Sequence, residues 1–365
     1  MVNPFVPSFG VIPKLQVGNE NVIDNYVLQL SAGNPMYRTR MIYGVRGSGK
    51  TVMLRSIENQ VKFSNDWIVI QLNVEGQDSL LSQLVAKLSK QMGFSLKNLL
   101  HKFKSISLIG GNGIAWDNTQ DSTTAMMAED LLNALKKQNK QLLVTLDEVY
   151  ATASLKEFAS QYQIWIGSGL PICLLFTGIP SQIDTLKNEK GMTFLWRTPK
   201  LVLEQINAQD VQAKYQDAFG EIDPLLLGQM SQLVDHYAFA FQVVGYVIWN
   251  KVDGNGPLIK QGIIDGCISD IKTLLFNQSY IKIYQELTPQ QHRFLKLIAH
   301  QSSFIIKISD IVQQFKVGKN LQTQRSTVDR LRRKLINDQI LQSPNRGQIK
   351  MGLPFFKDFL LDMDN

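Results

Sequence analysis

Residues 44–51 read Gly-Val-Arg-Gly-Ser-Gly-Lys-Thr and match the phosphate-binding pattern G-x-x-x-x-G-K-T in full. Glycines at this spacing let backbone N–H groups turn inward around phosphates, and a following helix adds its positive N-terminus. The ammonium group of Lys50 suits the β- and γ-phosphates, and the Thr51 hydroxyl suits Mg²⁺. The motif predicts bound ATP with Mg²⁺. The residues expected to hold them are Gly44, Arg46, Gly47, Ser48, Gly49, Lys50, Thr51 and Val52.

Two acidic residues, Asp147 and Glu148, follow the apolar run of residues 141–146. A buried parallel strand that ends in acids brings carboxylates to the sheet edge where phosphates and metals bind. We expect Asp147 to hold the Mg²⁺ ion, mainly through its water shell, and Glu148 to act as the general base on the attacking water. The alternative interpretation is a pair of acids that caps the next helix.

Two further positions have catalytic interpretations. Thr177 ends the apolar run of residues 171–176 and suits a contact with the γ-phosphate or its water, although a helix-capping threonine is the alternative. Arg197 follows the apolar residues 194–196 and suits an arginine finger, a role worth roughly 10³ to 10⁵ in rate where it exists. A surface arginine paired with an acid is the alternative. The predicted catalytic residues are therefore Lys50, Glu148, Thr177 and Arg197.

These residues need a parallel sheet to position them. The apolar runs that we expect to form strands are residues 38–45, 67–74, 141–146 and 171–177. Helical periodicity separates them, at residues 20–30, 50–63, 79–91, 124–139 and 155–166. Strands that alternate with helices predict an α/β fold of the P-loop NTPase (AAA+-like) type, with helices on both faces of the sheet.

The pattern changes after residue 204, where the strand signal ends. Residues 309–315 and 323–338 predict two helices joined by a glycine-containing turn at 317–322, and residues 340–343 and 348–351 predict a hairpin. Helix, turn, helix and hairpin in this order indicate a winged helix. The expected domains are an N-terminal arm and first helix (1–36), an ATPase core (37–204), a helical lid (205–280) and a winged-helix domain (281–365).

The positive charge of the chain is concentrated in one segment. Nine basic and two acidic side chains lie within residues 316–350, so this segment accounts for the whole net charge of +7. Such a concentration favours an anionic partner, and double-stranded DNA is the expected one. The predicted contacts are Arg325, Arg330, Arg332 and Arg333 on the second helix, and Arg346 and Lys350 at the hairpin. A solvated basic face, or a winged helix that docks on a protein, is the alternative.

The composition is that of a globular protein, with 44% apolar and 19% charged residues. No apolar run reaches the roughly 20 residues of a membrane-spanning helix, and residues 1–13 lack the pattern of a secretory signal. We therefore expect a cytoplasmic protein with no membrane partner. The two cysteines, Cys173 and Cys267, lie in apolar segments and are expected to be buried thiols rather than a disulfide or a metal site.

With these residues established, the chain resembles bacterial AAA+/STAND-type ATP-binding proteins related to the origin-recognition and archaeal ATPase group. The resemblance covers nearly the whole length and rests on residues 3–10, 44–54, 146–149, 177–180, 194–197 and 241–246. It implies an N-terminal arm near the adenine, an αβ ATPase core, a helical lid and a C-terminal winged helix.

The chain departs from this family at three places. Residues 18–20 read Gly-Asn-Glu where Gly-Arg-Glu or Gly-Arg-Asp is usual, and residues 236–238 read His-Tyr-Ala in place of Gly-Tyr-Pro. Residues 206–280 contain no arginine, which excludes a sensor-2 arginine from that stretch. These departures favour slow, STAND-like switching over fast motor turnover.

The first functional hypothesis is therefore an ATP-hydrolysing switch, as a monomer or an oligomer, whose nucleotide state repositions a winged helix on DNA. The second is a signalling or scaffold ATPase whose winged helix docks on a protein. A nucleotide binder with negligible turnover is the third.

Overall fold

Five parallel strands form the sheet at the centre of the first half of the chain. They lie in the order β2-β3-β4-β1-β5. Their bounds are β1 (Thr39–Tyr43), β2 (Trp67–Leu72), β3 (Gln141–Leu146), β4 (Ile172–Gly178) and β5 (Lys200–Val202). All pairings are parallel, so the carboxyl ends of the strands meet at one edge of the sheet. This edge is where ligands bind in open α/β sheets.

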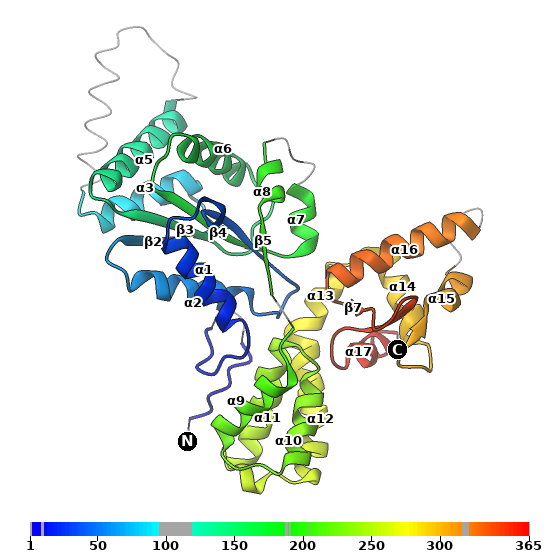
Figure 1. Ribbon diagram of the computed structural model, residues 1–365. Helices are drawn as coiled ribbons and strands as arrows, with labels where there is room; N and C mark the ends of the chain where they lie inside the picture. Colours follow the sequence, from blue (N-terminus) through cyan, green and yellow to red (C-terminus); the bar gives the residue numbers. More distant parts are fainter. Residues whose placement is uncertain are drawn as a thin grey trace, which may run out of the picture. The chain divides into compact units, whose positions relative to one another are not determined.

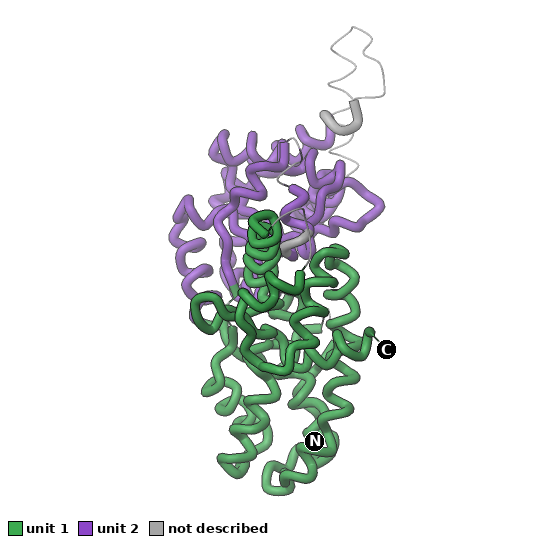
Figure 2. The backbone as a smooth tube through the Cα atoms, turned by 90° about the vertical axis from the view of Figure 1, so that its right-hand side faces the viewer, with its two compact units in different colours: residues 1–20, 44–52, 203–365 green, residues 21–43, 53–202 purple. Residues whose placement is uncertain are grey.

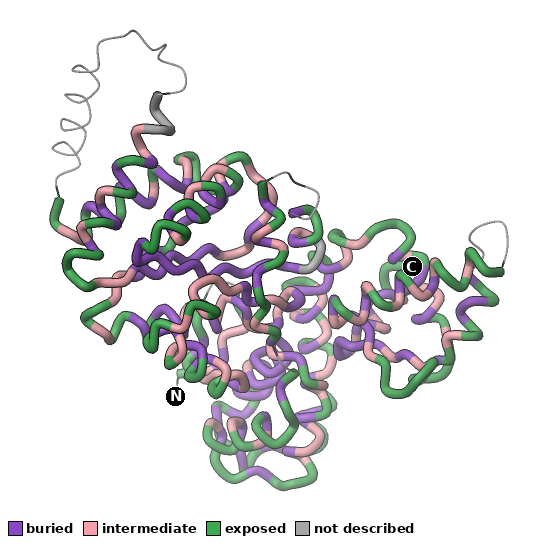
Figure 3. The backbone as a smooth tube through the Cα atoms, turned by 45° about the horizontal axis from the view of Figure 1, so that its top comes forward, coloured by how far each residue is buried: buried purple, intermediate pink, exposed green. Residues whose placement is uncertain are grey.

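Helices cover both faces of the sheet (Figure 1). The helices α1 (Glu20–Ser31) and α2 (Lys50–Lys62) lie on one face, and α3 (Leu80–Gln91), α5 (Thr119–Lys137) and α6 (Ala153–Gly167) lie on the other. Because successive side chains of a strand point to opposite faces, both faces of these strands must be apolar. The strand residues are accordingly mostly buried, as Figure 3 shows.

The predicted α/β class and parallel sheet are confirmed, and the four predicted strands are present within two or three residues of their expected ends. β5 was not expected. Its three residues, Lys-Leu-Val, are too few to show a period. Two short helices follow β4, namely α7 (Pro180–Leu186) and α8 (Thr193–Arg197).

The structure is a computed structural model that describes residues 2–8, 11–94, 119–186, 189, 191–203, 205–315 and 321–364. The chain divides into two units, which Figure 2 shows in different colours. Unit 1 contains residues 1–20, 44–52 and 203–365, and unit 2 contains residues 21–43 and 53–202. The phosphate-binding loop thus belongs to unit 1, whereas the sheet belongs to unit 2.

Unit 1 joins the N-terminal arm to a group of helices, and the arm runs along one of them. The Val6 N–H donates to Gln242 Oε1 (3.0 Å), and Phe5 packs against Gly245, whose added Cβ would lie 2.4 Å from the Phe5 ring. The helices are α9 (Ala208–Phe219), α10 (Pro224–Val234), α11 (Ala238–Val252), α12 (Gln261–Leu275) and α13 (Ile281–Gln285). A single π-helical turn, η3 (Phe276–Tyr280), connects α12 to α13.

The last part of unit 1 contains four helices and a small antiparallel sheet in the order β6-β8-β7. The helices are α14 (Pro289–Ala299), α15 (Ile308–Gln314), α16 (Leu321–Asn337) and α17 (Phe356–Asp362), and the strands are β6 (Ile306–Lys307), β7 (Leu341–Gln342) and β8 (Gln348–Met351). Val328, Leu331 and Leu335 of α16 are buried on one face of the helix. Most of the expected turn at 317–322 lies outside the described residues.

No helix within the described part of the chain has both the length and the hydrophobicity needed to span a bilayer. Both cysteines are buried and carry free thiols, in agreement with the sequence. Burial raises the pKa of the Cys173 thiol to about 11, although the neighbouring Arg38 guanidinium acts in the opposite direction.

Candidate nucleotide site

The loop of residues 44–49 connects the end of β1 to the first residue of α2, which is Lys50. Gly47 and Gly49 have φ angles of +79° and +98°, which residues other than glycine rarely adopt. A Cβ atom on Gly47 would also lie 2.0 Å from the Tyr237 hydroxyl oxygen. The backbone conformation therefore requires glycine at positions 47 and 49. At position 47 the close approach of Tyr237 also requires it.

Two polar side chains of the motif contact the same carbonyl oxygen inside the loop. The Lys50 ammonium group donates to Val45 O (2.8 Å), and the Ser48 hydroxyl donates to the same oxygen (2.8 Å). Lys50 is only 6% exposed. A buried ammonium group needs oxygen partners, and Val45 supplies one of them within the loop. Thr51 and Val52 follow in the first turn of α2, where both are half-buried.

Residues from later in unit 1 contact the same loop. The Tyr237 hydroxyl donates to Arg46 O (2.8 Å), and the Phe239 N–H at the start of α11 donates to Gly47 O (3.1 Å). The Arg46 guanidinium forms an ion pair with Glu286 (3.3 Å), which follows α13. Sequence reasoning singled out Tyr237 only as part of a departure from a family pattern, and it gave no signal for Phe239 or Glu286.

In unit 2, the end of β4 lies against the residues that follow β3. The Thr177 hydroxyl donates to Asp147 Oδ1 (2.5 Å) and accepts from the Glu148 N–H (2.7 Å). Thr177 is fully buried, and Asp147 and Glu148 are half-buried. Glu148 has a φ of +50°, a left-handed conformation that is uncommon for residues other than glycine. The structure therefore brings together three of the predicted residues through one hydroxyl group.

The alternative that Asp147 and Glu148 cap the next helix is wrong. α6 begins at Ala153, and its N-cap is Thr152, whose hydroxyl accepts from the Leu155 N–H (3.0 Å). The two acids lie before this cap and outside the helix.

A buried carboxylate that the sequence did not reveal joins α2 to β3. Glu58 is 3% exposed, and its oxygens accept hydrogen bonds from Arg55 (2.8 and 3.0 Å) and from the Thr145 hydroxyl (2.5 Å). Thr145 lies on β3, two residues before Asp147, which follows the strand. Because Glu58 lies in a helix near the polar residues Arg55, Asn59 and Gln60, its pattern resembles that of a solvent-exposed position, and only the packing shows that it is buried.

The other predicted site residues belong to other helices and strands. Arg197 is the last residue of α8 and is exposed. Three of the arginines of α16 and the turn residue Arg346 are exposed, whereas Arg332 is half-buried beside Asp329 (3.7 Å between Nε and Oδ1). Lys350 lies on β8 with its ammonium group 5.6 Å from the centre of the Phe304 ring. The exposed arginines of α16 are Arg325, Arg330 and Arg333.

Two family models match parts of the sequence. Residues 20–225 match a family described as "KAP family P-loop domain". Residues 277–360 match a model described as "Domain of unknown function (DUF8462)". A comparison with curated protein sequences gives no significant match.

Several solved structures are similar over almost their whole length. The ORC2 protein of Aeropyrum pernix, in ADPNP–ADP complexes, has a TM-score of 0.59 at 16% sequence identity, over 94% of this chain and 91% of that chain. CDC6P from Pyrobaculum aerophilum has a TM-score of 0.48 at 14% identity, over 98% and 96% of the two chains. The ORC1 protein of Aeropyrum pernix in complex with DNA has a TM-score of 0.45 at 13% identity, over 98% and 95%. The first of these similarities shows a shared fold.

Proposed function

The chain belongs to the KAP family of P-loop domains, and from this premise we propose that it is an ATP-binding switch with slow hydrolysis that moves a basic winged helix on double-stranded DNA. The loop of residues 44–49 is the observation that carries the nucleotide part of this proposal. Gly47 and Gly49 have positive φ angles, and Lys50 at the end of the loop is buried. In the nucleotide-bound state a phosphate oxygen would take the place of the Val45 carbonyl as a partner of Lys50.

The residues of the loop fit a triphosphate by their chemistry. Lys50 would bind the β- and γ-phosphates, and the backbone N–H groups of the loop would surround them. Beyond Lys50, the residues that would contribute through the loop or the first turn of α2 are Gly44, Arg46, Gly47, Ser48, Gly49, Thr51 and Val52. A bound Mg²⁺ ion would neutralise phosphate charge, with the Thr51 hydroxyl and Asp147 as its protein partners.

Hydrolysis requires a base that orients water. Glu148 is the proposed base, because it directly follows Asp147 at the carboxyl edge of the sheet and its N–H is fixed by Thr177. Thr177 would hold Asp147 in one orientation through its hydrogen bond. Arg197 remains a candidate arginine finger, since it is exposed at the end of α8 and so available to a γ-phosphate in a partner chain or to a protein partner.

The DNA part of the proposal rests on the exposed face of α16. Val328, Leu331 and Leu335 bury one face of this helix, so Arg325, Arg330 and Arg333 project from the other. The order α14, β6, α15, α16, β7, β8 is that expected of a winged helix, in which α16 would be the recognition helix and the β7–β8 hairpin the wing. Arg332, Arg346 and Lys350 would supply phosphate contacts near the same face.

We propose the domain boundaries on the same basis. An arm and first helix would occupy residues 1–36, the ATPase core 37–204, a helical lid 205–280 and the winged helix 281–365. Because the loop of residues 44–52 packs with the later helices in unit 1, a nucleotide in the loop has a direct route to the lid. Such an arrangement suits a two-position switch.

A second candidate function is a STAND-like scaffold ATPase whose winged helix docks on a protein. The observation that favours it is Phe304, which is 66% exposed next to β6 and lies beside Lys350. Aromatic side chains are enriched at protein interfaces.

Titration of a labelled DNA duplex, with and without Mg·ATP and across a salt series, tests the proposal. If about five phosphates are contacted, the logarithm of the binding constant should fall with the logarithm of salt at a slope of about −4 to −5. The affinity should also differ between the two nucleotide conditions. A duplex that does not bind at low salt contradicts the DNA proposal and favours the protein-docking function, which nucleotide-dependent co-purification of a partner would then support.

A further inference from the structure

Both carbonyl groups at the crest of the phosphate-binding loop are held by residues at the start of α11. Arg46 O accepts from the Tyr237 hydroxyl (2.8 Å), and Gly47 O accepts from the Phe239 N–H (3.1 Å). In a trans peptide the N–H and the C=O point in opposite directions and rotate together. The direction of the Gly47 N–H is therefore fixed by what holds Arg46 O, and that of the Ser48 N–H by what holds Gly47 O.

The Ser48 N–H at present points to Val45 O (3.2 Å) within the loop. Phosphate binding at this motif uses the loop N–H groups as donors. Turning the Gly47–Ser48 peptide toward a phosphate must move Gly47 O relative to the Phe239 N–H. Because each peptide group is rigid, binding of a phosphate in the loop is linked to the hydrogen bonds that Tyr237 and Phe239 donate to it.

Tyr237 also contacts the π-helical turn η3, through a hydrogen bond with Ser279. Its phenol has one hydrogen, which is donated to Arg46 O, so the Ser279 hydroxyl must donate to the phenol oxygen (2.7 Å). Both side chains are buried, and Ser279 lies within η3. Burial raises the pKa of the Tyr237 phenol, although the Ser279 hydrogen bond and the Arg46 charge lower it, so the hydroxyl keeps its hydrogen at neutral pH.

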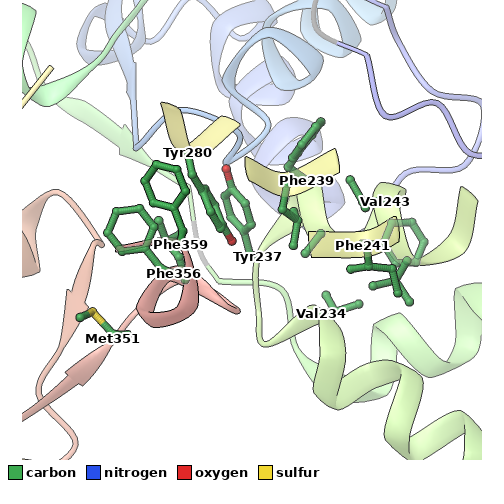
Figure 4. Close-up of a cluster of buried hydrophobic side chains, with 14 of the residues drawn as sticks. Val234, Tyr237, Phe239, Phe241, Val243, Tyr280, Met351, Phe356 and Phe359 are labelled. Atoms are coloured by element: carbon green, nitrogen blue, oxygen red, sulfur yellow. The ribbon is translucent and has the colours of Figure 1, made fainter. Parts of the chain in front are cut away.

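Tyr280, the next residue of η3, connects Tyr237 to residues 354–356. The Tyr280 ring lies 6.3 Å from the Tyr237 ring and 5.1 Å from the Phe356 ring, between centroids. Its hydroxyl donates to Pro354 O (2.5 Å). Figure 4 shows Tyr237, Tyr280, Phe356 and Phe359 packed beside one another in the same cluster. Single π-helical turns within α-helices occur frequently at functional sites.

A second contact joins the same two regions. Arg46 of the loop forms an ion pair with Glu286, in the connection between α13 and α14. The side chains are 16% and 32% exposed, so solvent weakens the pair, and we assign it the smaller part of the link. The buried Tyr237 contacts form the larger part.

We propose that Tyr237 is a positioning residue that aims the peptide groups of the phosphate-binding loop and transmits their rearrangement through Ser279 and Tyr280 to residues 353–361. The proposal rests on the proposed function in one respect, namely that the loop binds Mg·ATP. It adds the route by which occupancy of the loop reaches α17. We assign Tyr237 no contact with the reacting atoms.

The test compares Tyr237→Phe with wild-type protein in two measurements. Calorimetry gives the dissociation constant of Mg·ATP, and hydrogen exchange gives the protection of the amides of residues 353–361 with and without Mg·ATP. We expect wild-type protection to change about tenfold on nucleotide binding, within the range typical of coupled sites. In Tyr237→Phe this response should fall to less than about twofold, while the dissociation constant weakens by no more than about tenfold.

A matched control is Tyr215→Phe. Tyr215 is also fully buried, and its hydroxyl also donates to a backbone carbonyl, Phe241 O (2.9 Å). Its ring packs against Phe5, Phe219 and Phe241 rather than against the loop. Its loss should cost similar stability and leave the nucleotide response of residues 353–361 unchanged. Ser279→Ala should reproduce most of the Tyr237→Phe effect, and the double variant should lose little more than either single one.

The possible outcomes distinguish failure of the Tyr237 proposal from failure of the proposed Mg·ATP binding. Wild-type protein that does not bind Mg·ATP removes the proposed function and this inference with it. Wild-type protein that binds Mg·ATP without a change at residues 353–361 overturns the inference alone. The same holds if Tyr237→Phe responds as wild type does, or if Tyr215→Phe loses the response equally.

Discussion

The Thr177 hydroxyl donates a 2.5 Å hydrogen bond to Asp147 Oδ1, and the Thr177 hydroxyl oxygen accepts a 2.7 Å hydrogen bond from the Glu148 N–H. A hydroxyl has one hydrogen to donate, and here Asp147 takes it. Thr177 therefore fixes the carboxylate proposed for Mg²⁺ and the backbone of the proposed base at once. A contact between Thr177 and the γ-phosphate, which the sequence suggested, stays a prediction.

Removing this hydroxyl should slow hydrolysis. Thr177→Val keeps the shape of the side chain but removes the hydrogen bond that Thr177 donates to the Asp147 carboxylate and the one that it accepts from the Glu148 N–H. Partners behind a metal ligand are worth about 10- to 100-fold in activity or metal affinity, so we expect phosphate release to fall by about that factor. Thr177→Ser retains the hydroxyl and should stay within about threefold of wild type. Equal rates for the valine and wild-type proteins would contradict the positioning role.

Glu148→Gln tests the proposed base. The amide keeps the size of the side chain but cannot take a proton, so steady-state phosphate release should fall by about 10²- to 10⁴-fold, while Mg·ATP affinity remains within about threefold. Radiolabelled ATP is needed if turnover is slow. Rates that are near zero in both proteins would instead support a nucleotide binder without turnover and discredit Glu148 as the base.

Lys50→Ala should weaken Mg·ATP binding by about 10- to 100-fold, because a hydrogen bond from a charged group contributes about 1.5–3 kcal/mol. Calorimetry measures the effect directly. Lys62→Ala is the matched control, since Lys62 is an exposed lysine in the last turn of the same helix and should change the affinity by less than about twofold. If both variants bind like wild type, the loop is not the nucleotide site.

Replacing Arg330 and Arg333 by alanine should make the salt dependence of DNA binding shallower. Each phosphate contact contributes about −0.9 to the slope, so the loss of two contacts should change it by about 1.8. Lys136 and Lys137, in the last turn of α5, serve as a control pair with the same change in net charge. An equal loss in both double variants would indicate a general charge effect rather than a DNA surface on α16.

The contact between the arm and α11 should be sensitive to a single methyl group. Gly245→Ala places a Cβ 2.4 Å from the Phe5 ring, which aromatic neighbours hold in place. Overpacking costs about 1–3 kcal/mol, more than the roughly 0.5–1 kcal/mol that alanine adds to helix stability. The urea midpoint should therefore fall. Gly266→Ala, in α12, where the added Cβ would meet open space, should raise it instead.

The four long strands, their helices and the loop between β1 and α2 follow from the sequence because each depends on neighbours along the chain. A glycine motif bounded by a strand and a helix identifies its own context, and the period of the apolar residues identifies the buried faces. β5 escaped prediction, since three residues show no period. Glu58 escaped it too, because burial of a charged residue depends on the partners that surround it.

The sequence by itself determined the sheet, the phosphate-binding loop and the acids after β3. Only the tertiary structure decided how Thr177 joins those acids and how Tyr237 and Glu286 hold the loop, across 191 and 240 residues of chain from Arg46. The physical reason is that periodicity and turn chemistry act between residues close in sequence, whereas a side-chain hydrogen bond between distant segments exists only once the core has brought them together. The sequence around Tyr237, where the chain departs from the family pattern, did not indicate that Tyr237 bonds to Arg46 O. The reason is that this acceptor is a backbone carbonyl, which every residue possesses.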